Sequence, residues 1–234
     1  FQALGMDDWF YDKMAIPPDI ANYAVKEPKR HGFIGLNVTI PFKEQALEFA
    51  VPDDVARAVG AVNTIDFRDD TGTNTDVVGF IDDLKAHDVP IAGQRVLVLG
   101  AGGAARAAVY GLWREQAQVI VVNRTMERAQ QMLTKLTFSA GVRDVRAVTL
   151  DEAVEWQPQI IVNATSAGMH PHTEHMPWVT GVPFPQNVTL YDMVYRPAQT
   201  ALMQFTEKHG GRAIGGLGML VRQGAASFKI WTGV

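Results

Sequence analysis

A glycine-rich stretch between an apolar strand and an alanine-rich helix constrains the fold of this chain more than any other feature. Gly100-Ala101-Gly102-Gly103-Ala104-Ala105 follows a predicted strand at 96–99 and opens a predicted helix at 104–115. Glycines permit the tight turn and let backbone N–H groups reach a diphosphate at the helix N-terminus. The stretch predicts a dinucleotide-binding turn, with a purely structural turn as the alternative. A Walker A loop is excluded, since no Gly-Lys-Ser/Thr follows.

Apolar strands alternate with helical patterns on both sides of this turn, which predicts an α/β chain with a Rossmann-type, doubly wound parallel sheet. A smaller α/β part precedes it, in which Gly35 to Ile40 reads as a strand, and Pro41 with Phe42 to Ala50 as a helix. The helix predicted from Asp76 to His87 marks the boundary. We expect a first domain at 1–78, a nucleotide-binding domain at 79–214, and a helix at 215–234 that returns towards the first domain. The other predicted segments are a helix to about 59, strands at 61–67, 119–122, 159–162 and 190–194, and helices at 126–136 and 217–230.

Composition excludes several classes of function. The 234 residues carry a formal charge of −4, so they offer no basic field for nucleic acid. With no cysteine there is no disulfide, thiolate nucleophile or Cys-type metal site. No apolar run approaches the ~20 residues of a membrane span. We expect a cytoplasmic protein with no membrane partner.

The residues after the second predicted strand of the nucleotide-binding part indicate which dinucleotide binds. An NAD-preferring site usually carries an acid there, whereas this chain has Asn123-Arg124-Thr125 and then Arg128. The planar fork of Arg124 suits a 2′-phosphate, and Thr125 adds a hydroxyl donor. The sequence therefore predicts NADP, the alternative being an exposed arginine beside a Thr125 helix cap.

Lys43 and Asp76 are the candidate acid–base residues. Lys43 is predicted in the first turn of the helix that Pro41 begins, where the partial positive charge disfavours an ammonium. The alternatives are a surface lysine packed on an aromatic ring, and Asp76 as the N-cap of the helix that follows it. Uncharged polar residues that suit a polyhydroxylated ligand surround both in the sequence: Asn37, Thr39, Asn63, Thr64, Asn74 and Thr75.

At these residues the chain resembles the shikimate dehydrogenase family. Asn37-Val38-Thr39-Ile40-Pro41-Phe42-Lys43 is similar to the family's substrate-site motif, and the motifs that follow occur in the family's order over essentially the whole chain. They are Gly60 to Thr64, Asn74 to Asp76, Gly100 to Ala104, Asn123 to Thr125, Asn163 to Met169, Tyr191 to Tyr195, and Gly216 to Gln223.

The resemblance implies a smaller substrate domain, a Rossmann domain for NADP, and reversible NADPH-dependent reduction of 3-dehydroshikimate to shikimate, on the route to chorismate and aromatic amino acids. Lys43 is implied as the acid–base residue and Asp76 as its partner. The family's Ser-x-Ser strand, which holds the substrate carboxylate, would precede Phe1, and its final helix would follow Val234. The implied substrate residues are Asn37, Thr39, Lys43, Asn63, Asp76, Tyr195 and Gln223. The implied cofactor residues are Gly100, Ala101, Gly102, Gly103, Ala104, Asn123, Arg124, Thr125, Arg128, Thr165, Ser166, Met193 and Gly216.

Three further hypotheses stay open. The chain could be a quinate dehydrogenase or a related paralogue acting on another polyol acid, or an NADP-binding sensor without catalysis.

One stretch is crowded with possible metal ligands: His170, His172, Glu174 and His175. Pro171 and Pro177 bracket it as an irregular loop, so we expect no metal. We expect a monomer or a homodimer.

Overall fold

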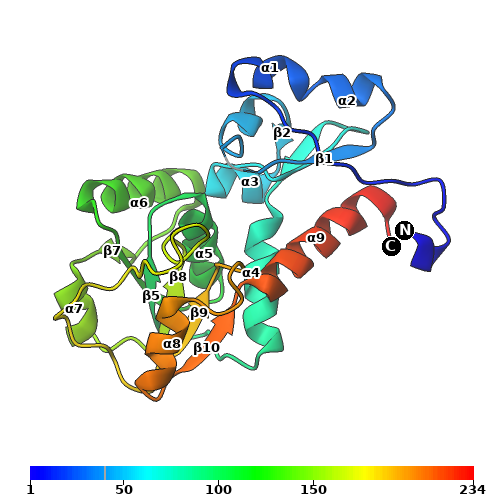
Figure 1. The fold of residues 1–234 in the computed structure, drawn as a ribbon. Helices are drawn as coiled ribbons and strands as arrows, with labels where there is room; N and C mark the ends of the chain where they lie inside the picture. The colour runs from blue at the N-terminus through cyan, green and yellow to red at the C-terminus, as the bar shows by residue number, and fades with distance from the viewer. Residues whose placement is uncertain (40) are drawn as a thin grey trace.

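Two separate sheets organise the chain. The computed structural model describes residues 1–39 and 41–234. Strands at residues 35–73 form a four-stranded sheet in the order β1-β3-β4-β2, and strands at residues 95–215 form a six-stranded sheet in the order β10-β9-β8-β5-β6-β7. We call residues 1–73 the first lobe and residues 87–215 the second lobe. Figure 1 shows the first lobe above the second, with α4 (Thr75–Ala86) and α9 (Leu217–Thr232) running between them. The predicted α/β class is confirmed.

The first lobe is built on a mixed sheet whose register gathers polar residues at one place. β1 pairs antiparallel with β3, and β3 pairs antiparallel with β4. This register sets Asn37 opposite Thr64, and Thr64 opposite Thr73. The elements are η1 (Gln2–Leu4), η2 (Pro18–Ile20), α1 (Ala21–Ala24), α2 (Glu27–Arg30), β1 (Gly35–Asn37), η3 (Gln45–Glu48), β2 (Val51–Pro52), α3 (Asp54–Val59), β3 (Thr64–Asp66) and β4 (Thr71–Thr73).

All strand pairs of the second lobe are parallel. The chain proceeds from β5 outwards to β6 and β7, and then returns to the other side of β5 with β8. The order therefore reverses between β5 and β8, the place where doubly wound sheets bind ligands. The elements are β5 (Arg95–Leu99), α5 (Gly103–Arg114), β6 (Gln118–Val122), α6 (Met126–Ala140), β7 (Arg146–Ala147), α7 (Leu150–Glu155), β8 (Ile160–Asn163), β9 (Thr189–Asp192), α8 (Ala201–Lys208) and β10 (Arg212–Gly215).

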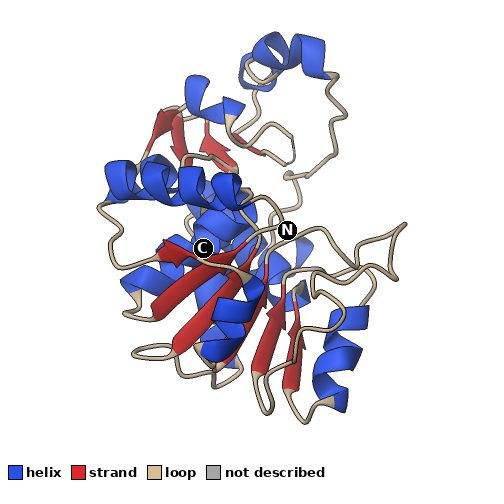
Figure 2. Ribbon diagram, turned by 90° about the vertical axis from the view of Figure 1, so that its left-hand side faces the viewer, coloured by secondary structure: helices blue, strands red, loops and turns tan. Residues whose placement is uncertain are grey.

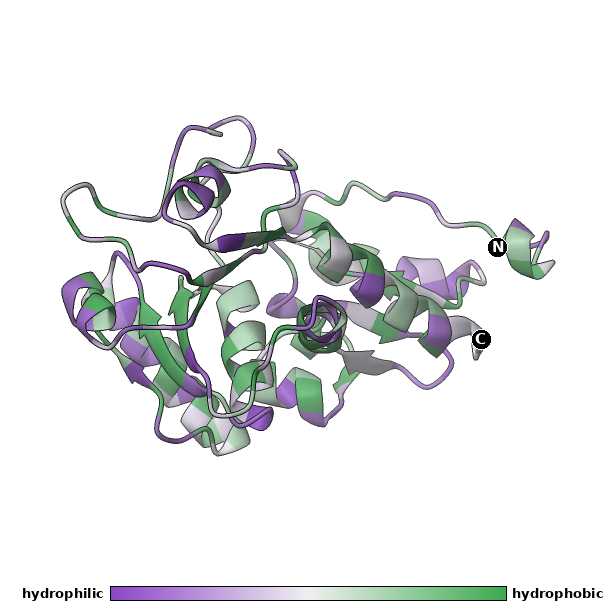
Figure 3. Ribbon diagram, turned by 90° about the horizontal axis from the view of Figure 1, so that it is seen from below, coloured by the Kyte–Doolittle hydropathy of each residue, from purple (hydrophilic) through white to green (hydrophobic). Residues whose placement is uncertain are grey.

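The strands of this sheet are buried on both faces. Val96 and Val98 pack into a cluster with residues of α4, α5 and α6, whereas Leu97 and Leu99 pack with residues of α7 and α8. Figure 2 shows helices on both sides of the large sheet, and in Figure 3 its strands are coloured as hydrophobic along much of their length. Continuous apolar strands are what a parallel sheet covered on both faces requires.

Helix α9 attaches to the first lobe at its C-terminal end. Trp231 Nε1 donates to the carbonyl of Ile65 at 3.0 Å. A Cβ on Gly35 would lie 2.0 Å from Trp231 Nε1, so the indole needs a glycine there. Arg68 ties the same end by donating to Ile230 O and to Asp66. No helix within residues 1–39 or 41–234 is both long enough and apolar enough to cross a membrane.

The segment that carries Lys43 differs from its prediction. β1 ends at Asn37, short of the predicted strand end, and Ile40 lies outside the described residues. No α-helix forms at 42–50; η3, a single 3₁₀ turn, takes its place. The Lys43 carbonyl accepts from Val62 N at 2.8 Å, and Leu47 N donates to Glu44 O at 3.3 Å. Because that carbonyl pairs with Val62 N, it does not start an α-helical ladder, and Lys43 does not lie at a helix N-terminus.

The Arg68–Asp66 pair makes a prediction about pH. The hydrogen bond from Arg68 lowers the pKa of Asp66. Asp66 therefore binds protons less readily in the folded chain, so its stabilising contribution is present above the pKa of the unfolded chain and is lost as pH falls through the folded pKa. We expect Arg68→Gln to be less stable than the parent at about pH 6, and the difference to narrow below about pH 4.

Urea unfolding at several pH values measures this difference. Arg57→Gln is the matched control, because its partner Asp54 has a side chain that is 96% exposed. The control should show no comparable pH dependence. A stability difference for Arg68→Gln that stays constant down to about pH 3 would contradict the prediction.

Candidate active site

Lys43 and Asp76 form an ion pair between the first lobe and the start of α4. Lys43 Nζ lies 2.7 Å from Asp76 Oδ2, and the two side chains are 24% and 11% exposed. Partial burial lowers the local dielectric, so the pair attracts more strongly than an exposed pair. The site therefore holds an ammonium close to a carboxylate, both within reach of solvent or a ligand.

Asp76 is available to Lys43 because other residues cap α4. The N-cap is Asn74, whose side chain accepts from Asp76 N at 3.1 Å, and Asn63 Oδ1 accepts from Thr75 N at 2.8 Å. Two asparagines thus satisfy the first donors of the helix. The alternative prediction that Asp76 itself is the N-cap is wrong, and its carboxylate is free for other partners.

The helix that acts on the pair is α4 and not one that begins at Lys43. Asp76 lies in the first turn of α4, where the partial positive charge of the helix end favours a carboxylate. Asp76 Oδ1 also accepts from Asn63 Nδ2 at 2.9 Å. The helix end therefore stabilises the anionic partner, which in turn holds the lysine.

Gln223 reaches the same place from α9. Its Oε1 accepts from Thr75 Oγ1 at 3.3 Å and lies 3.5 Å from Asn63 Nδ2, which donates to it. Asn63 thus contacts both Asp76 and Gln223, and its carbonyl accepts from Asn37 Nδ2 at 3.2 Å. Of the predicted substrate residues, the structure brings together Asn37, Lys43, Asn63, Asp76 and Gln223.

Thr39 and Tyr195 are not joined to this group. Both residues are exposed, and in the described part of the chain neither side chain hydrogen-bonds to the others. Their role in binding stays a prediction.

Two residues of the network were missed from the sequence. Ser227 is fully buried, and its Oγ lies 2.7 Å from Thr64 Oγ1 and accepts from Asn37 Nδ2 at 3.1 Å. It stands four residues after Gln223 on α9, so helical spacing would have placed both on one face. The Tyr11 hydroxyl donates to Asn37 Oδ1 at 3.0 Å, a contact that no sequence motif signals.

A close approach of α4 and α9 sets the position of Gln223. A Cβ on Gly79 would lie 2.8 Å from Gln223 Cβ and 2.9 Å from its backbone nitrogen. A Cβ on Gly218 would lie 2.1 Å from Asp83 Oδ1. The glycines let the two helices touch where the Gln223 amide of α9 meets Thr75 and Asn63, beside Asp76.

Asp83 fixes this contact from inside. It is 1% exposed, and it accepts from Tyr191 Oη at 2.7 Å and from Arg222 Nε at 3.1 Å. Burial, with the hydrogen bond to Asp83, raises the pKa of Tyr191 far above its ordinary value. One buried carboxylate therefore links α4, β9 and α9.

The predicted dinucleotide turn lies where the strand order reverses. Gly100, with φ +115°, follows β5, and a Cβ on it would lie 3.0 Å from the carbonyl of Ala164, which follows β8. Gly102 is the N-cap of α5 and provides no side-chain cap, and a Cβ there would meet nothing within 4 Å. No side chain caps the positive end of α5, and there is room beside Gly102, which fits a diphosphate.

The residues after β6 fit a 2′-phosphate. Arg124 and Arg128 are exposed, and among residues 1–39 and 41–234 neither side chain has a hydrogen bond or an ion pair. Asn123 Nδ2 donates to Thr125 O at 2.8 Å, and Thr125 is the N-cap of α6 without a side-chain cap bond. Two unpaired guanidinium groups and a hydroxyl suit a dianion.

The remaining predicted cofactor residues follow β8 and β9 or precede α9. Asn163 Oδ1 accepts from Thr165 N at 3.0 Å, and Asn163 O accepts from Met193 N at 3.0 Å. A Cβ on Gly216 would lie 2.3 Å from Met193 O, so these two residues are packed together. Ser166 is exposed. Thr165, Met193 and Gly216 thus surround the same end of the sheet as Gly100.

The histidine-rich loop gathers three possible metal ligands. His172, Glu174 and His175 place ligand atoms within 4.8 Å of one another, and all three residues are exposed. His175 Nε2 lies 3.3 Å from Glu174 Oε1. This arrangement is also that of an exposed ion pair, and the predicted absence of a metal stays a prediction.

Comparison with known proteins identifies the family of the chain. Residues 1–65 match the shikimate dehydrogenase substrate binding domain, residues 83–177 match shikimate / quinate 5-dehydrogenase, and residues 216–234 match the shikimate 5'-dehydrogenase C-terminal domain. The chain is 42% identical over 234 residues to a shikimate dehydrogenase (NADP(+)) of Methanocella arvoryzae, covering 100% of this chain and 86% of that protein. The chain belongs to the shikimate dehydrogenase family.

Solved structures of this family share the fold. A shikimate 5-dehydrogenase of Thermus thermophilus, in complex with NADP(H) and shikimate, matches with a TM-score of 0.88 at 35% identity and covers 100% of this chain and 85% of that one. A quinate dehydrogenase of Corynebacterium glutamicum, in complex with NAD, matches with a TM-score of 0.81 at 28% identity and covers 92% and 78%. The predicted Rossmann-type fold is confirmed.

The contact between α4 and α9 makes a stability prediction. Gly79→Ala inserts a methyl group against the Gln223 backbone, so we expect it to lower the free energy of unfolding by about 1–3 kcal/mol. Gly224→Ala, on α9 in open space, is the matched control and should raise stability by about 0.5–1 kcal/mol. Urea unfolding compares them, and equal gains from both substitutions would contradict the tight contact.

Proposed function

We propose that this chain catalyses the reversible NADPH-dependent reduction of 3-dehydroshikimate to shikimate. The observation that carries the proposal is the Lys43–Asp76 pair, bordered by Asn63 and Gln223, in a member of the shikimate dehydrogenase family. A protein that only bound a dinucleotide would have no use for a shielded ammonium–carboxylate pair outside the glycine turn.

Lys43 moves the proton in this reaction. NADPH, when bound, supplies the hydride to the carbonyl carbon, and NADP accepts it in the reverse direction. During reduction Lys43 Nζ donates a proton to the carbonyl oxygen as it becomes a hydroxyl, and during oxidation Nζ accepts that proton. Asp76 orients Lys43 and accepts a hydrogen bond from a neighbouring substrate hydroxyl.

Helix α9 supports the proposed placement of the substrate and of the dinucleotide. Gly216, beside Met193, precedes its first residue, and Gln223 lies two turns further, about 10 Å along the axis at 1.5 Å per residue. This spacing suits a substrate ring held between Gly216 and the Lys43–Asp76 pair. We propose that Asn37, Thr39, Lys43, Asn63, Asp76, Tyr195 and Gln223 hold the substrate. We propose the cofactor residues named from the sequence, at 100–104, 123–125, 128, 165–166, 193 and 216, for NADP.

The two lobes have different proposed roles in binding. We propose that residues 1–78 bind the substrate, that residues 79–214 bind NADP, and that residues 215–234 join the two. The oligomeric state, a monomer or a homodimer, stays a prediction. The cytoplasmic location of the protein also stays a prediction.

Lys43→Ala tests the acid–base assignment. Loss of the proton donor should lower kcat for shikimate oxidation by about 10²–10⁴-fold. Lys26→Ala, a change at an exposed lysine of the same lobe, should leave kcat unaltered. Steady-state rates with NADP measure both variants, and near-parental turnover of Lys43→Ala would rule the assignment out.

Arg124→Ala tests recognition of the 2′-phosphate. The KM for NADP should rise by about 10-fold or more, the loss expected for a charged hydrogen bond, while the KM for NAD stays nearly constant. Arg143→Ala is the control, since Arg143 is another exposed arginine of the second lobe. Equal effects of Arg124→Ala on the two cofactors would show that Arg124 does not contact the 2′-phosphate.

Quinate oxidation is the second candidate, favoured by the likeness to a quinate dehydrogenase in complex with NAD. Rates measured with shikimate or quinate, each with NADP or NAD, separate the two. We expect turnover with shikimate and NADP, because Arg124 and Arg128 offer unpaired cations after β6. Tight NADP binding without turnover of either acid would instead support a sensor.

A further inference from the structure

A buried arginine of the second lobe binds the residue that follows Lys43. Arg106, near the start of α5, is 7% exposed, and its Nη2 donates to Glu44 Oε1 at 2.6 Å. Glu44 itself is 63% exposed at its side chain. The ion pair therefore crosses from the helix that opens with the glycine turn to the loop that carries the acid–base lysine.

The guanidinium of Arg106 also lies beside two glycines of the site motifs. Its Nη1 is 3.9 Å from the place of a Cβ on Gly60, and its Nη2 is 3.9 Å from that on Gly103. Gly60 ends α3 three residues before Asn63, and Gly103 belongs to the dinucleotide turn. One planar group is thus in reach of two motifs, one from each lobe, and of Glu44, which directly follows a third.

The surroundings make Glu44 the partner on which Arg106 depends. A buried guanidinium is costly unless an anion pairs with it, and the partial positive charge at the start of α5 raises that cost. In the described residues Glu44 is the anion that Arg106 contacts, and Arg106 Nε is the buried side-chain nitrogen without a hydrogen bond. The attraction therefore holds Glu44 in place.

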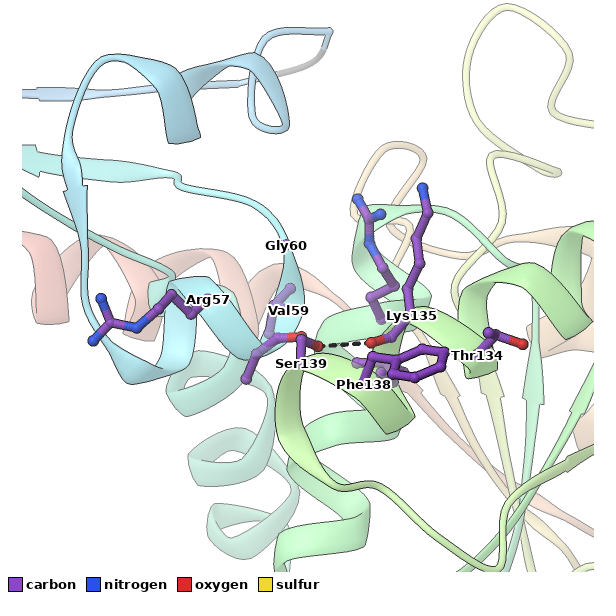
Figure 4. Close-up of a pocket in the computed structure, with 10 residues that line it drawn as sticks. Arg57, Val59, Gly60, Thr134, Lys135, Phe138 and Ser139 are labelled. Atoms are coloured by element: carbon purple, nitrogen blue, oxygen red, sulfur yellow. Dashed lines mark hydrogen bonds between the residues drawn. The ribbon is translucent and has the colours of Figure 1, made fainter.

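The lobes also pack against each other at this edge, since Val59 of α3 is buried in the same apolar cluster as Ala105 of α5 and Leu136 of α6. A cavity of about 370 Å³ opens between α3 and α6 beside Arg106. Figure 4 shows the two helices facing each other across it, with Ser139 pointing towards α3. Ser139 Oγ donates to Ala58 O at 2.7 Å. Polar contacts therefore add to the apolar packing between the lobes here. The lining includes Arg57, Val59, Gly60, Arg106, Lys135 and Ser139.

We propose that Arg106 and Glu44 are positioning residues that set Lys43 relative to the dinucleotide turn. The Lys43 backbone is held on one side by the bond from Val62 N at 2.8 Å and on the other by the Glu44–Arg106 pair. Neither Arg106 nor Glu44 acts on the substrate. This inference rests on the proposed function of Lys43.

Glu44→Gln tests the proposal without burying a new group, because Glu44 is exposed. Misplacement of Lys43 should lower kcat for shikimate oxidation by about 10- to 100-fold, while the KM for NADP changes less than about twofold. Glu48→Gln is the matched control: it is an exposed glutamate four residues on, in η3, whose side chain has no partner in the described chain. A kcat for Glu44→Gln equal to that of Glu48→Gln would overturn the proposal.

A second variant separates positioning from simple stabilisation. If the pair acts as a unit, Arg106→Gln together with Glu44→Gln should be no slower than Arg106→Gln alone. If the double variant instead showed the product of the two single losses in kcat, the two residues would act independently, and the proposal that they act as a unit would be overturned. A lower melting temperature for Glu44→Gln with an unchanged kcat would also count against the proposal, because it would show a merely structural pair.

Hydrogen exchange supplies a readout that needs no turnover. The backbone amides of residues 43–48 should exchange faster in Glu44→Gln than in the parent or in Glu48→Gln, since the anchor of Glu44 is lost. Equal exchange in all three would overturn the proposal. A parent without activity on shikimate would refute the proposed function instead, and the exchange result would still decide whether the pair holds this loop.

Discussion

The close contact of α4 with α9 is the constraint on which the rest of the site depends. Gly79 allows the backbone of Gln223 to lie against α4, and the buried carboxylate of Asp83 ties both helices to β9. α9 begins beside Met193 of the second lobe and ends with Trp231 in the first. A single helix therefore spans both lobes, and its contact with α4 sets where the Gln223 amide meets Thr75 and Asn63, beside Asp76.

The two charged sites of the molecule, the Lys43–Asp76 pair and the arginines after β6, differ in whether their charges are paired. At the start of α4, asparagine side chains take over the capping so that Asp76 can hold Lys43, and both charges are shielded and paired. After β6, the side chains of Arg124 and Arg128 are exposed and unpaired within the described chain. A shielded pair keeps a proton donor in one geometry, whereas exposed guanidinium groups can bind an incoming dianion at little cost in desolvation.

The strands and helices around the glycine turn were predictable because each carries its own signal. Continuous apolar runs predicted the central strands of the second lobe, and 3.6-residue periodicity predicted α5, α6 and α9. The short elements β7, α7, α8 and β10 were not predicted. For α7 a local signal exists, since Thr149 and Glu152 form a capping box. The helix predicted at 42–50 was wrong because the Lys43 carbonyl pairs with Val62 of a distant segment.

Local patterns in the sequence were enough to predict the fold class, the dinucleotide turn and the order of the polar motifs, because backbone conformation and strand burial depend on neighbouring residues. Long-range packing determines that Asn74 and not Asp76 caps α4, that Ser227 and Tyr11 join the network, and that Arg106 contacts Glu44. These choices are between competing donors and acceptors far apart in the chain. Which of them pair depends on how the two lobes and α9 pack, and no local pattern records that packing.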